Sequence, residues 1–276
     1  MTRKFVLSLA AFCLLNRKCR VTSFYRTLCI RALIVLLFSS PLSAHRAEPI
    51  STEFALPFGP GSGNLKIIYE YEREGLGASR QALPELELEF GGGQRWQLNL
   101  GFPLIRLKEG RDEPSALAGG KLEVGMRYLL FGGARSNYAV SFQGTVEAPT
   151  GNRRLFGNTP ELSPGLFFDR YVGQHIRLHS NLSWRTTVGD ADEPERAFEY
   201  RNAVLWFASE RWVPGFELLG ATNTDSGETA FAVQPEVIFL AGPHLELKLG
   251  MPVGLTSNTP DIGVRAQVSI LWGETD

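Results

Sequence analysis

Cysteine is scarce in this chain of 276 residues and is confined to its first part, at Cys13, Cys19 and Cys29. The remainder of the chain contains no thiol. This excludes a disulfide framework, a thiolate metal site and a cysteine nucleophile from the body of the protein. The pattern is typical of a protein that works in an oxidising compartment without disulfide bonds.

The body also lacks long hydrophobic runs and any excess of charge of one sign. Mean hydropathy is -0.07 and formal net charge is -1. A helical membrane protein would show runs of roughly 20 apolar residues. A basic or acidic excess that would favour nucleic acid as a partner is missing. A membrane β-barrel remains allowed, because only every second residue of its strands meets lipid.

The N-terminal region has the features of a secretory signal. Arg26 and Arg31 precede the apolar run 32–38, and the small residues of 39–44 follow. This order of a basic region, a short apolar core and a small-residue zone predicts a targeting segment at 1–44, cleaved after Ala44. Cleavage after Ala47 and a short membrane anchor are the alternatives.

Beyond residue 64 the apolar residues recur with a period of two, which indicates β-strands. In the stretch 85–90, three glutamates alternate with Leu86, Leu88 and Phe90, and only a strand places these two sets on opposite faces. Most of the alternating segments approach the 9 to 11 residues, roughly, that a tilted strand needs to cross a bilayer. The predicted strands are 65–73, 84–90, 95–103, 121–131, 136–148, 162–171, 175–188, 197–208, 212–221, 230–240, 244–252 and 261–272.

The connections between these segments alternate between long and short along the whole chain. The short ones are 91–94, 132–135, 172–174, 209–211 and 241–243, and the long ones are 74–83, 104–120, 149–161, 189–196, 222–229 and 253–260. Tight turns at one end and longer loops at the other are typical of an outer-membrane barrel. The sequence therefore predicts an all-β fold, a transmembrane antiparallel up-and-down β-barrel of about twelve strands at 65–276, with its short turns in the periplasm.

In a closed membrane barrel the apolar face meets lipid and the polar face lines the lumen, whereas a soluble barrel has the opposite arrangement. Aromatic residues at strand ends on the apolar face are predicted to form interfacial girdles, and the alternative is that they fill a soluble core. These girdle candidates are Tyr71, Trp96, Tyr128, Tyr138, Trp184, Tyr200, Trp206 and Trp272.

The segment 45–64 shows no strand period and is polar and rich in turn residues, including Pro57, Pro60 and Gly61. Two interpretations stay open. The segment is either a periplasmic lead before the barrel or a plug folded into the lumen.

Three stretches carry a resemblance to known proteins: the glycine-rich start of a strand at 119–128, the Pro-Thr-Gly strand end at 147–152, and the final strand at 259–265. They resemble a family of outer-membrane transporters that is named for the MetA pathway of phenol degradation. The resemblance implies an outer-membrane barrel with a transport role. The barrel-assembly machinery reads a terminal aromatic residue in many such barrels, and here four residues follow the last aromatic, Trp272.

Charged and polar residues on the predicted inward faces are the candidates for lining the lumen. They would set selectivity, or else neutralise one another across neighbouring strands and close the lumen. These candidates are Glu87, Glu89, Glu123, Arg127, Glu147, Arg177, His179, Arg201, Glu236, Glu246, Lys248 and Arg265.

Neither a metal site nor a catalytic group is predicted. His175 and His179 are assigned to the inward face of one strand, but their separation of about 13 Å is too long for one metal ion. Ser183 shares that face, yet no orienting acid is identified, and the Gly-x-Ser-x-Gly elbow is missing. No cofactor motif is present.

The leading hypothesis is a non-enzymatic, porin-like barrel in the outer membrane of a Gram-negative cell, reached after signal-peptide cleavage. It would pass a small molecule of apolar or aromatic character in either direction. Its expected partners are outer-membrane lipid and lipopolysaccharide, the barrel-assembly machinery and the permeant, without nucleic acid. The alternatives are a non-conducting structural or surface barrel and an outer-membrane lipid hydrolase.

Overall fold

The computed structural model describes residues 47–74, 78–108, 116–151, 159–189 and 196–273. Every regular element in these ranges is a β-strand. Within the same ranges, no helix has the length and apolar character needed to cross a membrane.

All strands belong to one sheet that closes on itself. They form twelve antiparallel wall strands, because β3 and β4, β5 and β6, and β13 and β14 are pairs of segments within single wall strands. In chain order the segments are β1 (Gly63–Glu74), β2 (Ala78–Gly91), β3 (Trp96–Phe102), β4 (Leu104–Lys108), β5 (Ala116–Gly119), β6 (Leu122–Gly132), β7 (Tyr138–Ala148), β8 (Glu161–Val172), β9 (Ile176–Thr187), β10 (Arg196–Trp206), β11 (Trp212–Asn223), β12 (Thr229–Leu240), β13 (Leu245–Gly250), β14 (Val253–Gly254) and β15 (Ile262–Trp272).

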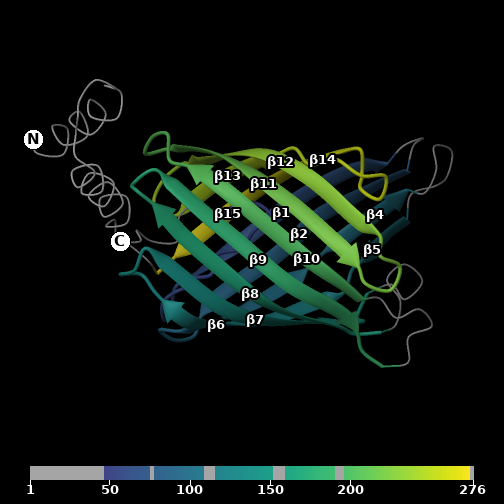
Figure 1. Ribbon diagram of the computed structural model, residues 1–276, viewed down its shortest axis with the longest axis horizontal. Helices are drawn as coiled ribbons and strands as arrows, with labels where there is room; N and C mark the ends of the chain where they lie inside the picture. Colours follow the sequence, from purple (N-terminus) through teal and green to yellow (C-terminus); the bar gives the residue numbers. More distant parts are fainter. Residues whose placement is uncertain (1–46, 75–77, 109–115, 152–158, 190–195, 274–276) are drawn as a thin grey trace, which may run out of the picture.

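The first strand closes the barrel by pairing with both the second and the last. Gly63 of β1 lies opposite Trp272 of β15 on one side and opposite Phe90 of β2 on the other. Every other neighbouring pair follows chain order, so the topology is up-and-down and the strands run obliquely around the wall (Figure 1). Closure removes the unpaired sheet edges that a hydrocarbon environment would not tolerate.

The two ends of the barrel differ. The connections at 92–95, 133–137, 173–175, 207–211 and 241–244 share one end, here called the short-turn end. β1 begins and β15 finishes at the same end. The opposite end, where β1 finishes and β2 begins, is called the loop end. At the short-turn end Gly132 adopts a positive φ of 78°, and a Cβ there would lie 2.1 Å from the carbonyl oxygen of Tyr138, so this tight turn needs glycine.

The two faces of the wall are reversed relative to a soluble barrel. On β6, Val124, Met126 and Tyr128 are exposed, while Arg127 between them is 1% exposed. The same alternation recurs around the sheet: the exposed large side chains are apolar, and the buried set is rich in Glu, Gln, Asn, Arg and Lys. An apolar outer band around a polar interior is the arrangement of a transmembrane barrel, and the prediction of fold class is confirmed.

Two of the predicted loops are largely strand. The loop expected at 74–83 shrinks to the residues between β1 and β2, because β2 begins at Ala78. Pro84, which lacks an N–H, is accommodated at a register shift where Tyr69 of β1 faces both Leu83 and Pro84. The loop expected at 104–120 contains β4 and β5, which pair with each other beyond the interruption at Pro103.

Candidate functional site: the lumen and the segment inside it

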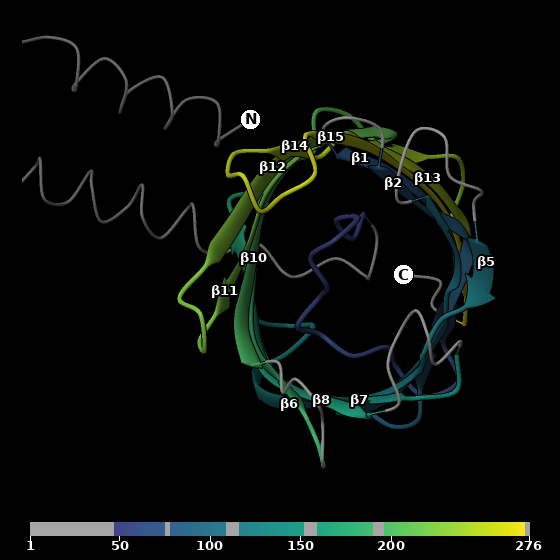
Figure 2. The ribbon, with the colours of Figure 1, turned by 90° about the vertical axis from the view of Figure 1, so that its right-hand side faces the viewer.

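Residues 47–62, here called the lumen segment, lie inside the barrel rather than beside it (Figure 2). The segment starts near the short-turn end, where the N–H of Ala47 donates to Glu246 of β13. It rises to about the middle of the wall at Ser51 and Glu53. It then returns to the short-turn end, where Gly61 and Gly91 are hydrogen-bonded, and continues into β1.

The wall holds this segment with side chains that accept from its backbone N–H groups. The acceptors come from six strands and include four carboxylates. The bonds run from Ala47 to Glu246 (2.7 Å), Ile50 to Glu236 (3.0 Å), Ser51 to Glu217 (3.0 Å), Glu53 to Asn181 (2.7 Å), Ala55 and Leu56 to Asp169 (2.8 and 3.3 Å) and Phe58 to Gln97 (2.9 Å). The closed sheet has no edge left to offer this segment, so side chains do the pairing.

Three backbone carbonyls of the segment are also satisfied by the wall. Asn181 donates to the carbonyl oxygen of Glu53 at 3.0 Å while accepting from the same residue's N–H. Arg201 donates to the carbonyl oxygen of Ser51 at 3.1 Å, and the Ser141 hydroxyl donates to that of Ala55. The wall therefore forms hydrogen bonds with both the N–H groups and the carbonyl groups of the segment's main chain.

Side chains of the segment add ionic and aromatic contacts. Glu53 forms an ion pair with Arg127 of β6. The ring of Phe54 lies 5.1 Å from the ring of His179 and 5.3 Å from the guanidinium carbon of Arg177. Phe54 is thus enclosed by two wall residues of β9.

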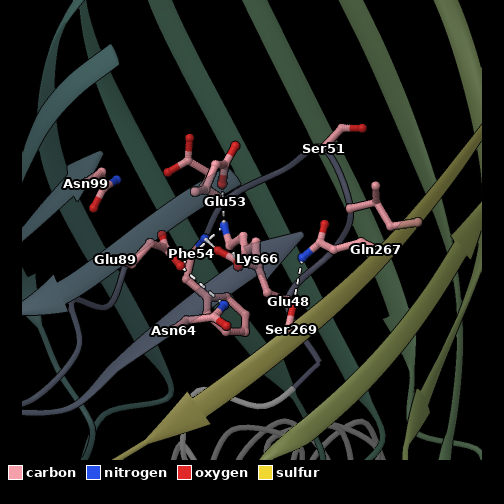
Figure 3. Close-up of polar contacts among 12 residues, drawn as sticks. Glu48, Ser51, Glu53, Phe54, Asn64, Lys66, Glu89, Asn99, Gln267 and Ser269 are labelled. Carbon is pink, nitrogen blue, oxygen red and sulfur yellow. Dashed lines mark hydrogen bonds and ion pairs between the residues drawn. The ribbon is translucent and has the colours of Figure 1, made fainter. Parts of the chain in front are cut away.

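Glu48 binds the segment to a buried cation of β1 (Figure 3). Its carboxylate lies 3.0 Å from Nζ of Lys66, which also lies 3.3 Å from Glu89. Burial acts to raise the pKa of Glu48, but Lys66, Lys248 and Arg127, together with the backbone N–H of Phe54, outweigh it and lower the pKa from 4.5 to about 2. Glu48 is therefore a charged anchor over the whole neutral range.

The return turn of the segment packs against a glycine of the wall. A Cβ on Gly91 would lie 2.0 Å from the carbonyl oxygen of Gly59 and 2.3 Å from that of Phe58. Only glycine allows the two backbones to approach this closely.

Apolar side chains close the short-turn end around the segment. Ala47 packs with Leu205, Val213, Ile238 and Leu240. On the other side, Ala55 packs with Leu129, Ala139 and Phe167. Two apolar clusters therefore fill part of the inward face near this end, among buried polar side chains such as Gln97 and Glu246.

The loop-end half of the lumen is lined by charges. Glu161 pairs with Lys121 and lies 3.9 Å from Arg185, which lies 3.2 Å from Glu199. Glu199 in turn lies 3.2 Å from Arg201. This chain of ion pairs joins β8, β9 and β10 across the wall.

A second group of loop-end charges is predominantly acidic. Glu123 lies opposite Glu147 in the register of β6 and β7, and Glu147 lies opposite Glu161 of β8. Arg265 of β15 pairs with Glu70 at 2.6 Å and lies 3.4 Å from Glu72. Many lumen charges are paired with one another, as mutual neutralisation would require. The acidic residues Glu123 and Glu147 of β6 and β7 are half-exposed, as charges that set selectivity would be.

None of the twelve predicted lumen candidates is exposed on the outer face. Seven are buried around the lumen segment: Glu89, Arg127, Arg177, His179, Glu236, Glu246 and Lys248. Five are half-buried, mostly in the loop-end half: Glu87, Glu123, Glu147, Arg201 and Arg265. The placement of His175 on the same face was wrong, because it is exposed in the turn before β9.

The predicted girdle residues lie on the outer face toward the two strand ends. Trp96, Tyr128, Tyr138, Trp206 and Trp272 lie toward the short-turn end, and Tyr71, Trp184 and Tyr200 toward the loop end. The sequence analysis missed Trp212, which is 51% exposed at the start of β11 and packs against Phe239 with ring centroids 4.7 Å apart.

Sequence reasoning also missed two acceptors that hold the segment, Glu217 and Asp169. Glu217 is fully buried and binds Ser51, Thr52 and Gln234. The period of two could have assigned it to the inward face of its strand. Asp169 follows two adjacent phenylalanines, so its face was ambiguous.

The acid–histidine pair Asp169 and His179 is used to contact the lumen segment. The residues that the structure describes contain no group of three or more His, Cys, Asp or Glu side chains arranged to hold a metal ion. One carboxylate oxygen of Asp169 lies 2.7 Å from Nδ1 of His179, and its second oxygen accepts from the N–H of Ala55. The neighbouring hydroxyl of Ser141 is directed to the carbonyl of Ala55. This constellation binds the segment.

Comparison with solved structures shows the same fold in outer-membrane channels. The COG4313 outer membrane channel from Pseudomonas putida F1 superimposes with a TM-score of 0.64 at 10% identity, over 82% of this chain and 100% of that one. The NanC porin gives 0.54 at 6% identity over 77% and 100%. The KdgM porin, in complex with disordered oligogalacturonate, gives 0.52 at 10% identity over 77% and 99%.

No protein with a curated description is detectably similar in sequence. A family model described as "MetA-pathway of phenol degradation" matches residues 78–272, which span β2 to the last strand. This match covers more than half of the chain and confirms the resemblance seen in the three sequence stretches. The chain belongs to the MetA-pathway of phenol degradation family of outer-membrane β-barrels.

Proposed function

We propose that the protein is a passive, non-enzymatic channel whose short-turn half is closed by the lumen segment. One observation carries this proposal: a closed wall with an apolar exterior surrounds a charged lumen, and residues 47–58 inside that lumen are hydrogen-bonded to wall side chains. Side-chain contacts can be exchanged for water without breaking any strand pairing of the wall. Displacement of the segment would uncover the buried Glu217, Asn181 and Asp169 on the inward face of the wall.

The permeant we propose is a small molecule that combines an aromatic ring with polar groups. The family description refers to phenol degradation, which supports an aromatic molecule. The loop-end half of the lumen is lined by Glu123, Glu147, Arg185 and Arg201, which favours a permeant with polar groups over a purely apolar one. A barrel of about twelve strands is narrow, which favours a small molecule.

We further propose that the short-turn end faces the periplasm and that outward Trp and Tyr side chains contact the two lipid interfaces. Short periplasmic turns and aromatic girdles are general features of such barrels. Outer-membrane lipid and lipopolysaccharide would surround the wall, and the assembly machinery would insert it after removal of residues 1–44.

A reversible disulfide bond between the lumen segment and the wall tests the channel proposal. The mature chain carries no cysteine, so Ala55→Cys and Ser141→Cys introduce the only pair, at two residues joined in the closed state by a hydrogen bond from the Ser141 hydroxyl to the Ala55 carbonyl oxygen. In a planar bilayer, we expect discrete conductance steps from the reduced double variant. Oxidation should abolish them, and reduction should restore them. Each single variant is the control and should not respond to oxidation.

The alternative is a non-conducting structural barrel, which predicts no steps in either redox state. If the reduced double variant and the native chain both stay silent after their folding is verified by heat-modifiable gel migration, the channel proposal is wrong.

A further inference from the structure

The lumen segment is bound through its main chain, as a peptide ligand would be, and it bends at 50–52 and 55–56. In 47–58, seven backbone N–H groups donate to wall side chains, and three carbonyls accept from them. Main-chain contacts of this kind depend on the course of the backbone and only weakly on the side chains that it carries. The wall of the short-turn half therefore has the chemistry of a peptide-binding site.

Asn181 shows this chemistry most clearly. Its side-chain amide accepts from the N–H and donates to the carbonyl of one residue, Glu53, at 2.7 and 3.0 Å. These two bonds reproduce what a neighbouring strand would offer. Asn181 is 5% exposed, so its side-chain amide is shielded from solvent where it binds Glu53.

Two side-chain subsites give the site a sequence preference. Arg127 receives the carboxylate of Glu53, and the next residue, Phe54, lies against His179 and Arg177. A third restriction follows at Ala55, whose side chain is fully buried against Leu129 and Ala139. The wall thus selects an acidic residue, an aromatic residue and a small residue in succession.

We propose that the short-turn half of the lumen is a binding site for short peptides that follow the same bent course and carry an acidic-aromatic-small sequence, and that the chain's own segment is its resident ligand. A free peptide must compete with a tethered one, whose effective concentration is on the order of millimolar for a short flexible connection. Binding from solution therefore becomes measurable when the resident segment is weakened. The inference rests on the contacts of the closed state and not on conduction, so a non-conducting barrel would leave it standing.

The test uses the full mature chain in detergent and a fluorescent peptide with the sequence of residues 47–58. Phe54→Ala in the chain weakens the resident segment and leaves the wall intact. We expect saturable binding, seen as a rise in fluorescence anisotropy, with an affinity at least about tenfold higher for the Phe54→Ala chain than for the native chain. A scrambled peptide of the same composition should bind at least about tenfold more weakly.

Wall variants in the Phe54→Ala background distinguish binding at this site from non-specific binding of the peptide to the barrel. Asn181→Ala removes two main-chain bonds and should weaken binding by about tenfold or more. Gln267→Ala is the matched control, because Gln267 is an equally buried inward amide that donates to Ser269. It should leave the affinity unchanged.

Disulfide capture locates the peptide and does not depend on folding of the Asn181 variant. A peptide carrying cysteine at the position of Ala55 should crosslink to Ser141→Cys, which touches that position in the closed state, and not to Thr145→Cys farther along β7. The proposal is overturned if the folded Phe54→Ala chain shows no saturable binding, if the scrambled peptide binds equally well, or if both cysteine positions crosslink alike.

Discussion

Glu217 is the wall residue whose replacement should release the lumen segment most strongly. It is 0% exposed and accepts from the N–H of Ser51 at 3.0 Å, the hydroxyl of Thr52 at 2.6 Å and Gln234 at 2.6 Å. Glu217→Leu leaves the two donors of the segment buried without an acceptor. A hydrogen bond to a charged group contributes about 1.5 kcal/mol or more, so the docked state should lose about 3 kcal/mol. That is a rise of about 150-fold in the ratio of released to docked segment.

Thiol labelling measures this ratio. Ala55→Cys places a thiol where the side chain is 0% exposed, so a maleimide reacts only when the segment is released. Glu217→Leu should accelerate labelling by about 150-fold relative to the Ala55→Cys parent. Glu217→Gln keeps the shape and one accepting oxygen but loses the charge, so its acceleration should be about tenfold.

The barrel itself is the internal control for this experiment. The side chain of Glu217 takes no part in the strand pairing of β11, so heat-modifiable migration should be unchanged in both variants. If labelling of Glu217→Leu is as slow as in the parent, the carboxylate does not hold the segment, and the assigned role of the wall acceptors is refuted.

Three further outcomes are expected. Leu249→Arg, at a side chain 53% exposed on the lipid face, should lower the free energy of unfolding in lipid vesicles by about 2–4 kcal/mol, while Leu249→Ile should not. Arg127→Met should accelerate Ala55→Cys labelling, because it leaves the carboxylate of Glu53 without its ion-pair partner. Adding Glu53→Gln should reverse part of that acceleration, and additive effects of the two substitutions would contradict their ion pair. When the segment is docked, the wall cations Lys66, Lys248 and Arg127 lower the pKa of Glu48 to about 2. The contribution of Glu48 to docking is therefore complete above pH 4.5 and is lost as the pH falls toward about 2, so channel opening should increase over that range. Glu48→Gln should remove that part of the pH response, and an identical profile in both proteins would count against the anchor role.

The strands of the wall were predictable because apolar and polar residues alternate within each strand, and this pattern can be recognised without knowing which strands are neighbours. Alternation such as that of Glu87, Leu88 and Glu89 assigns a face to each residue, and hydrocarbon outside the barrel requires the apolar set there. The pattern weakens near the short-turn end. Leu129 and Leu205 point inward although apolar, because they pack against the segment instead of water.

The lumen segment could only be left between two interpretations, because nothing in its own sequence indicates its partners. Its acceptors lie up to 199 positions away and come from six strands. They converge only after the sheet has closed. The acidic residues that hold it, such as Glu217 and Asp169, are indistinguishable in sequence from acids that line an open lumen.

The wall and the lumen segment differ in the hydrogen bonds that hold them. Each wall strand is held by backbone pairing with two neighbours, and residues 47–58 of the lumen segment are held by wall side chains that water can replace. Docking of the segment should therefore be a separate equilibrium from unfolding of the barrel, with a much smaller free energy. Combining Glu217→Leu, which acts on docking, with Leu249→Arg, which acts on the wall, should give additive effects in labelling and in unfolding, because the two side chains lie on opposite faces of the wall and share no contact. A large coupling between them would mean that the segment is part of the cooperative fold, and a gate that opens only when the barrel unfolds could not serve a channel.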